Sequence, residues 1–150
     1  MGLDTTHDCW HGAYSAFNRW RNKLALSAGY MLYKHGAGGP GIDADLLIYE
    51  SALIDWGLVR AKELEGDWDA IPVRIDGTPD PLLLLLAHYD CEGYLKVEHL
   101  EPLALRLQEL LPSLGDDEGG GHIGLYREKT QTFIDGLRKA AEARERVEFH

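Results

Sequence analysis

Five consecutive leucines, Leu82–Leu86, constrain the fold of this chain more than any other feature. The segment before them, residues 76–80, reads Asp-Gly-Thr-Pro-Asp and is typical of a turn. A short, continuously apolar run next to turn residues is typical of a strand that is buried on both faces. The sequence therefore predicts a central strand over residues 81–88.

Apolar residues at helical spacing predict several amphipathic helices around this strand. In each case the apolar positions recur every three or four residues and form one stripe. Prolines mark both ends of one of these segments, because proline is tolerated in a first turn and stops a helix elsewhere. The helices are expected at residues 13–28, about 43–64, about 101–111 between Pro102 and Pro112, and about 125–144.

Short strands complete the predicted fold. The candidates are residues 2–4, 71–75, 94–97 and 147–149. A chain of 150 residues with 45% hydrophobic content is long and apolar enough to form one domain with its own core. We therefore expect a single α+β domain, spanning residues 1–150, with about four helices packed on a small sheet whose central strand is near residues 81–88.

Two related motifs contain both cysteines of the protein. The first motif, His7–Gly12, reads His-Asp-Cys-Trp-His-Gly, and the second motif, His88–Gly93, reads His-Tyr-Asp-Cys-Glu-Gly. Each cysteine follows an aspartate and precedes a glycine by two or three positions. The second motif follows the predicted central strand, and such strand ends commonly carry binding groups. If the two motifs meet in space, they form one compact polar site.

One interpretation of this pairing is a metal site. Cys9 with His11, and His88 with Cys91, can supply four tetrahedral ligands for zinc or another transition metal. The spacing is not that of a known zinc finger. The alternative is that both cysteines are small buried hydrophobic residues.

Catalysis without a metal is a further interpretation. A thiol near histidine and aspartate can be activated as a nucleophile. Two of the carboxyl groups of Asp8, Asp90 and Glu92 can form a pair for general acid/base catalysis, in which one has a raised pKa and its partner is ionised. The same carboxylates can equally accept backbone hydrogen bonds in turns and helix starts.

A ligand site around the motifs draws on neighbouring aromatic and basic residues. Trp10 and Tyr14 can stack on a flat ligand group, or they belong to the core. Arg19, Arg127 and Lys129 can meet a phosphate or carboxylate, or they are solvated helix residues. The predicted ligand-contacting set is His7, Asp8, Trp10, His11, Tyr14, Arg19, His88, Asp90, Glu92 and Arg127.

The charge pattern limits the partners. The net charge of -10 argues against a dedicated nucleic-acid binder. Most lysines and arginines lie in residues 1–40 and 119–150, which creates an anion-attracting surface if these segments pack together. We see no signal peptide and no apolar run near the roughly 20 residues of a membrane span. A cytoplasmic protein with reduced thiols and no membrane partner is expected; the oligomeric state is left open.

Three blocks of the chain carry a family resemblance. The first combines Gly2-Leu3-Asp4 with the first motif, Tyr14 and Phe17; the second is the second motif; the third combines Tyr126–Lys129, Phe133, Gly136–Arg138 and Val147–His150. Together they resemble a family of short uncharacterised proteins of high-GC bacteria and their phages. Similar proteins read His-Ser-Asp-Cys-Asp-Gly where this chain has Tyr89 and Glu92. The resemblance implies that the blocks act as one unit and implies no particular chemistry.

These observations favour binding of a small polar or anionic ligand, with a nucleotide-like molecule as one candidate, in a pocket formed by the two motifs. The first alternative is a metal-assisted hydrolase that uses the same pocket and a bound water as its nucleophile. The second alternative is a structural or interaction protein, in which the motifs only join the first helix to the sheet.

Overall fold

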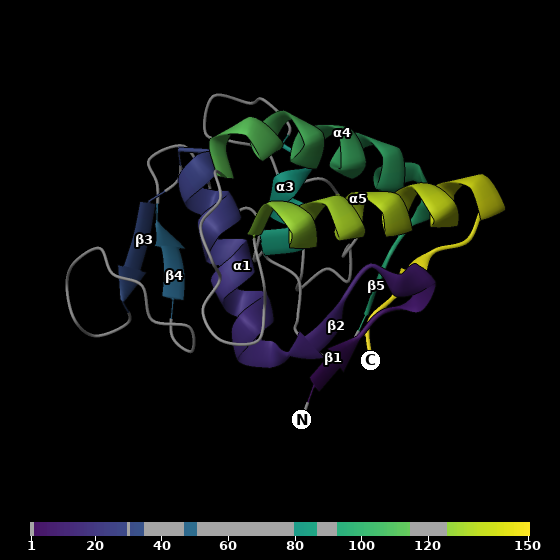
Figure 1. Cartoon of the computed structure of the whole chain (residues 1–150), viewed down its shortest axis with the longest axis horizontal. Coiled ribbons are helices and arrows are strands. Elements are labelled where there is room, and N and C mark those ends of the chain that lie inside the picture. Colours follow the sequence, from purple (N-terminus) through teal and green to yellow (C-terminus); the bar gives the residue numbers. More distant parts are fainter. Residues whose placement is uncertain (1, 30, 35–46, 51–79, 87–92, 115–125) are drawn as a thin grey trace, which may run out of the picture.

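The computed structural model describes residues 2–29, 31–34, 47–50, 80–86, 93–114 and 126–150. Within these residues the chain forms an α+β fold, as the sequence predicts (Figure 1). The elements are β1 (Gly2–Asp4), the 3-10 helix η1 (Thr6–Asp8), β2 (His11–Ala13), α1 (Tyr14–Ser27), β3 (Met31–Lys34), β4 (Leu47–Glu50), α3 (Leu82–Leu86), β5 (Tyr94–Leu95), α4 (Val97–Leu114), α5 (Tyr126–Ala143) and β6 (Val147–Glu148).

The core lies where α1, α4 and α5 bring their apolar stripes together. Helices α4 and α5 lie side by side and α1 crosses next to them (Figure 1). The predicted stripes are confirmed, since the buried residues of each helix recur at helical spacing. The fully buried members include Phe17, Trp20 and Leu24 of α1, Leu100, Leu103 and Leu107 of α4, and Phe133, Ile134 and Leu137 of α5.

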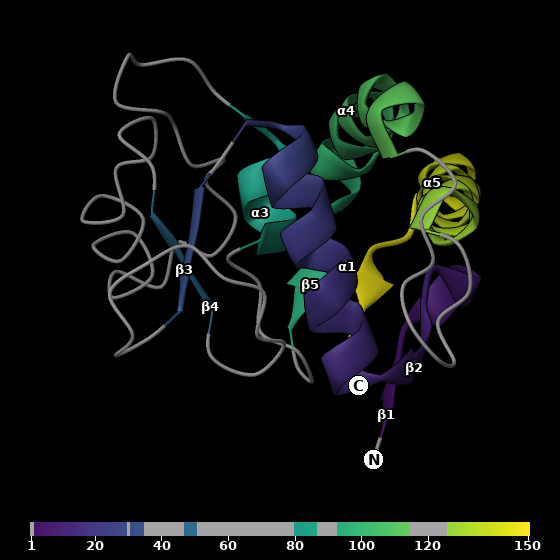
Figure 2. The ribbon, with the colours of Figure 1, turned by 60° about the vertical axis from the view of Figure 1, so that its left-hand side comes forward.

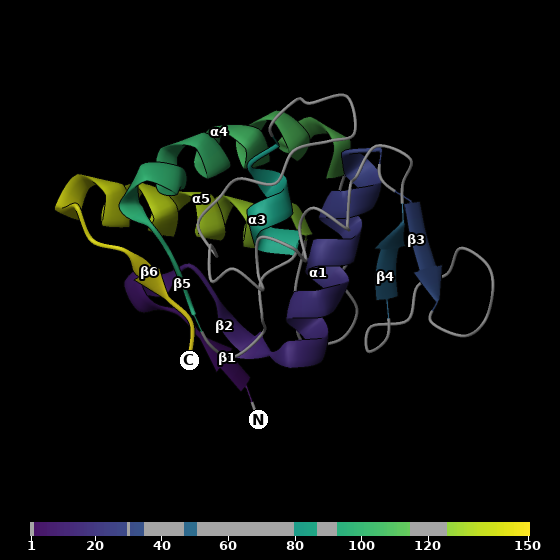
Figure 3. The same ribbon diagram turned by 180° about the vertical axis from the view of Figure 1, so that it is seen from behind.

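The two ends of the described chain build one set of paired strands, which we call the terminal sheet. Strand β1 pairs antiparallel with β2, and β5 pairs antiparallel with β6. An isolated bridge between Thr5 and Phe149 joins the two pairs. Beside it, Asp4 and His150 exchange two backbone hydrogen bonds of 2.8 and 2.9 Å. Figure 3 shows both ends of the chain at this sheet. The strands predicted at residues 2–4, 94–97 and 147–149 are thus confirmed, with shorter bounds for the last two.

The predicted central strand is wrong, because Leu82–Leu86 form helix α3 and all five leucines are buried. Leucine is a strong helix former and lacks the β-branching that favours strands. Asp80 and Pro81 provide a helix start: the Leu82 N–H donates to Asp80 Oδ1 at 3.0 Å. An apolar run of this length fits a helix buried on every side as well as a strand. Residues 87–88 lie outside the described part.

The helix predicted over residues 43–64 is also wrong at Leu47–Glu50, which is strand β4 and pairs antiparallel with β3. This segment reads Leu-Ile-Tyr-Glu, and its β-branched and aromatic residues favour a strand. The β3–β4 pair lies beside α1, on the side away from α5 (Figure 2). The rest of the predicted helix and the strand predicted at 71–75 lie outside the described residues.

Helix α4 is longer than predicted and contains both Pro102 and Pro112. Both prolines are exposed. Each removes one helical hydrogen bond, and on an exposed face water can hydrate the carbonyl that loses its partner. A proline on the solvent side therefore does not end this helix.

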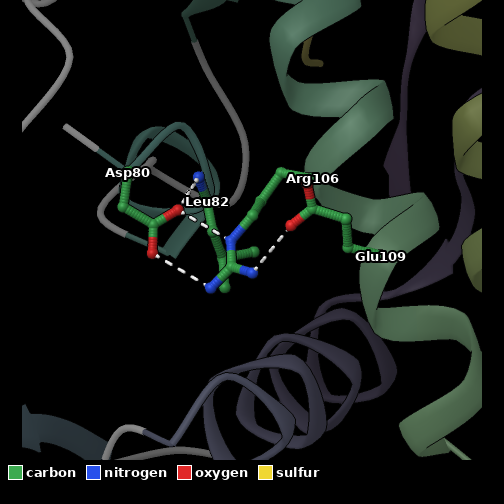
Figure 4. A network of polar contacts seen from close by, with 4 residues as sticks. All are labelled: Asp80, Leu82, Arg106 and Glu109. Atoms are coloured by element: carbon green, nitrogen blue, oxygen red, sulfur yellow. Dashed lines mark hydrogen bonds and ion pairs between the residues drawn. The ribbon is translucent and has the colours of Figure 1, made fainter.

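A buried ion pair fixes α3 against α4 (Figure 4). The Asp80 carboxylate, 1% exposed, accepts from Arg106 Nε at 3.1 Å and from a terminal nitrogen at 3.4 Å. Arg106 also donates to the exposed Glu109 at 3.2 Å. Burial lowers the pKa of Arg106, but the hydrogen bond and charge of Asp80 outweigh it and hold the pKa above its usual value.

Candidate functional site

The first motif forms most of the turn between β1 and β2 and the first two residues of β2. Thr5 closes it: the Thr5 N–H donates to the Trp10 carbonyl at 3.1 Å, and the Trp10 N–H donates to Thr5 Oγ1 at 2.9 Å. His7 and Asp8 have φ values of 60° and 56°, in the left-handed region that is uncommon for residues other than glycine. The turn thus holds two consecutive unfavourable conformations, which its surroundings stabilise.

Cys9 points into the core and not into a polar site. It is 1% exposed and lies so close to Gly136 of α5 that a side chain at position 136 would clash with Cys9 and with the His7 carbonyl. Burial, with a smaller contribution from Asp8, raises the pKa of the Cys9 thiol from 9.0 to about 12. The thiol is therefore protonated at neutral pH, which disfavours a role as a nucleophile in this state.

Trp10 is also a core residue. It is 3% exposed, stacks on Trp20 with ring centroids 5.1 Å apart, and meets Phe17 edge-on at the same distance. Lys129 of α5 places its Nζ 5.0 Å from the centre of the Trp10 ring. The Trp10 ring faces are thus already occupied, which favours the core interpretation over stacking on a ligand.

His7 links the first motif to the end of the chain. Its Nδ1 lies 3.1 Å from Thr6 Oγ1 and its Nε2 lies 3.5 Å from Glu145, just beyond α5. Thr6 Oγ1 in turn accepts a hydrogen bond of 2.9 Å from the Glu148 N–H of β6. The side chain of His7 is only 19% exposed, so these contacts hold it in place.

His11 differs from its neighbours because it projects from β2 into solvent. Its side chain is 89% exposed, and its Nδ1 contacts Oδ1 of Asp4, directly opposite on β1. A carboxylate at Nδ1 favours the tautomer that carries the proton there, so Nε2 is left facing outward. His150 is opposite Asp4 on the other side. Directly opposite residues of an antiparallel ladder share one face, so His11, Asp4 and His150 share the solvent face.

The other predicted ligand residues are dispersed or undescribed. Asp8 is exposed in the turn, Tyr14 is half-buried at the start of α1, and Arg19 and Arg127 are exposed on α1 and α5. His88, Asp90, Cys91 and Glu92 lie outside the described residues, so the joint site of the two motifs stays a prediction. Gly93 alone is described from the second motif. Its carbonyl accepts the Phe149 N–H at 3.0 Å, and Phe149 bridges to Thr5, just before the first motif.

The predicted metal ligands of the first motif do not lie together, because Cys9 is buried and His11 points into solvent. In the described ranges, no group of three or more His, Cys, Asp or Glu side chains is arranged to hold a metal ion.

Sequence reasoning missed Asp4 as a partner of His11. The pattern around it was readable: Asp4 is exposed between the buried Leu3 and Thr5, as expected for a strand with one solvent face. What the pattern could not give is the register that places Asp4 opposite His11. Apart from the presence of a glycine inside a helix, nothing in the sequence indicated that Gly136 contacts Cys9.

Comparisons with known proteins add no family or fold assignment: the chain matches no protein-family model, and no curated protein or solved structure matches it significantly. Among the described helices, none combines the length and the apolar composition that crossing a membrane requires.

Proposed function

We propose that the protein binds a small polar or anionic ligand through His11, on the solvent face of the terminal sheet. The observation that carries this proposal is the contact between His11 and Asp4. A histidine that is almost fully exposed gains nothing from burial, yet this ring is held by a carboxylate. Such an orienting carboxylate is the usual second partner of histidines that bind or exchange protons.

The chemistry of the oriented ring limits the ligand. Neutral Nε2 accepts one hydrogen bond, which suits a hydroxyl or amine; protonated Nε2 donates one, which suits a phosphate or carboxylate oxygen. His150 on the same face adds a second imidazole near Asp4. The two imidazoles support recognition of a ligand that carries both hydroxyl and anionic oxygens, as a nucleotide does.

The test is a titration with adenosine monophosphate. The imidazole resonances of His11 are monitored by NMR during the titration. We expect saturable shifts at His11. Asp4→Asn removes the charge that orients the ring and should weaken binding about tenfold, the loss of one charge-assisted hydrogen bond.

The matched control is Asp135→Asn, since Asp135 is an exposed aspartate on α5 that bonds only to Gln131 in the described part of the chain. It removes the same charge and should leave the affinity unchanged. If His11→Ala binds adenosine monophosphate as tightly as the natural protein, the proposal is wrong.

A further inference from the structure

The solvent face of the terminal sheet continues from β2 across to β5 (Figure 3). In the last strand Val147 and Phe149 are buried, so Glu148 and His150, which alternate with them, lie on the outer face. Tyr94 is directly opposite Glu148 in the β5–β6 pair and therefore shares that face. The outer face thus carries an aromatic ring in addition to the histidines of the proposed ligand contact.

Tyr94 stays outside the core, unlike the other aromatic side chains. It is 39% exposed, and it is the one exposed aromatic residue among those whose burial the structure describes. An aromatic ring in water forgoes the free energy that burial would supply, and a ligand with a flat apolar group can restore it. A single exposed ring is common on protein surfaces, so the argument depends on what surrounds Tyr94.

Arg146 holds the ring of Tyr94 in place. Its guanidinium carbon lies 4.3 Å from the centre of the ring, which is a cation–π contact. Glu148 holds the guanidinium in turn, because Nε and a terminal nitrogen of Arg146 donate to Glu148 Oε1 at 3.1 and 2.7 Å. The Arg146 side chain is itself 53% exposed. Tyr94 and Arg146 therefore form an exposed stack that is ordered before any ligand arrives, which lowers the entropy cost of binding.

This stack lies next to the histidines of the same face. Tyr94 is the diagonal neighbour of His150, which is two residues beyond Glu148, and diagonal neighbours of an antiparallel pair are about 7–8 Å apart. His150 is in turn opposite Asp4, the carboxylate that contacts His11. A ligand that contacts the imidazoles with one end can therefore reach Tyr94 with the other through a short linker such as a sugar.

We propose that the stack of Tyr94 and Arg146 binds the base of a mononucleotide whose phosphate lies at the histidines of the terminal sheet. Nucleobases stack on tyrosine rings and on guanidinium planes alike, and a protonated imidazole donates to a phosphate oxygen. The net charge of -10 repels a long phosphate backbone much more than a single phosphate, which favours a mononucleotide over a nucleic acid. This inference rests on the contact proposed for His11 and adds the class of ligand.

The test compares adenosine monophosphate with ribose 5-phosphate, which has the same sugar and phosphate but no base. Isothermal titration calorimetry gives the affinity of the natural protein for each. We expect adenosine monophosphate to bind about tenfold more tightly, as the stacking of one base on an aromatic side chain provides. Equal affinities for the two compounds would overturn the inference.

Variants of Tyr94 assign the difference to the ring. Tyr94→Leu retains an apolar side chain but no ring, so it should lower the affinity for adenosine monophosphate to that for ribose 5-phosphate and leave the latter unchanged. Tyr94→Phe retains the ring and should bind both compounds as the natural protein does. The matched control is Tyr126→Leu, since Tyr126 of α5 also has a cation near its ring, Lys23 at 6.0 Å, but lies outside the terminal sheet. It should change neither affinity.

His11→Ala separates this inference from the proposed function on which it rests. It should weaken both compounds alike, because both carry the phosphate. If ribose 5-phosphate binds and requires His11, but Tyr94→Leu leaves the affinity for adenosine monophosphate unchanged or lowers both affinities equally, the base contact is wrong and the His11 contact stands. If neither compound binds the natural protein, both the proposed function and this inference are wrong.

Discussion

Gly136 of α5 lies so close to Cys9 that a Cβ on Gly136 would be 2.6 Å from the Cys9 sulfur. It would also be 2.8 Å from both the Cys9 Cα and the His7 carbonyl oxygen. Two of these three atoms are backbone and cannot rotate away. The helix and the first motif are therefore in direct backbone contact, and only glycine permits it.

The first prediction concerns Gly136→Ala. In an ordinary exposed helix this change stabilises by roughly 0.5–1 kcal/mol. Here we expect destabilisation by about 2–3 kcal/mol, because the new methyl group overpacks the contact with the first motif. Urea unfolding at equilibrium measures the difference. A variant that is as stable as the natural protein would show that the first motif does not pack on α5 in solution.

The second prediction follows from the Cys9 thiol, whose folded pKa is raised from 9.0 to about 12 by burial. Below the unfolded pKa both states hold the proton, so the stabilisation from the neutral thiol is fully present. As the pH rises above the unfolded pKa, the unfolded chain releases the proton while the folded chain retains it. The free energy of unfolding therefore falls, by up to about 1.4 kcal/mol per pH unit.

The measurement for the thiol is the difference in unfolding free energy between the natural protein and Cys9→Ala. Cys91 is common to both chains and cancels. We expect the advantage of the natural protein to shrink by about 1 kcal/mol between roughly pH 8 and pH 10. A difference that is constant over this range would mean that Cys9 is solvated.

A third prediction isolates the ion pair between α3 and α4. Asp80→Asn retains an oxygen that can accept the Leu82 N–H but leaves Arg106 without its buried counter-ion. We expect a loss of about 3 kcal/mol in unfolding free energy. Glu109→Gln removes the exposed partner of the same arginine and should cost less than about 0.5 kcal/mol. Equal costs for the two variants would contradict the buried geometry.

The fourth prediction concerns Thr130, whose hydroxyl accepts from Trp20 Nε1 and donates to the Tyr126 carbonyl, each at 2.8 Å. Thr130→Val preserves the shape but leaves the Trp20 indole N–H buried and unpaired. The expected loss in unfolding free energy is about 1–3 kcal/mol. Thr132→Val, on the exposed side of the same helix, is the control and should change little. Thermal unfolding of both variants, followed by calorimetry, measures the two losses in stability.

Helical periodicity was the part of the fold that the sequence could predict. The helices α1 and α5 begin and end within one or two residues of their expected bounds, because each carries a long apolar stripe. The leucine run was predicted wrongly because a segment in which every residue is apolar has no periodicity that distinguishes a helix from a strand. Asp80 and Pro81 start helix α3, but the same residue types are also typical of turns, so the sequence did not identify them as a helix start.

The candidate site was less predictable, for a physical reason. The composition of the first motif indicates polar chemistry, but its residues differ in burial. Cys9 and Trp10 lie in the core, while His11 faces solvent. That sorting depends on the register that places Asp4 opposite His11 within the hairpin and on the long-range packing of Gly136 against Cys9. A local pattern contains neither the strand register nor the helix against which it packs.

The pairing at the terminal sheet has a consequence for biosynthesis. Thr6 receives its hydrogen bond from Glu148, which lies 142 residues further along the chain. A ribosome that makes the protein from its amino end releases β1 and β2 long before their partner exists. During that interval the edge of β1 is open to other strands, which is the usual route to aggregation. Contacts of such high sequence separation also form slowly, so we expect the surface that carries His11 to be among the last parts of the protein to mature.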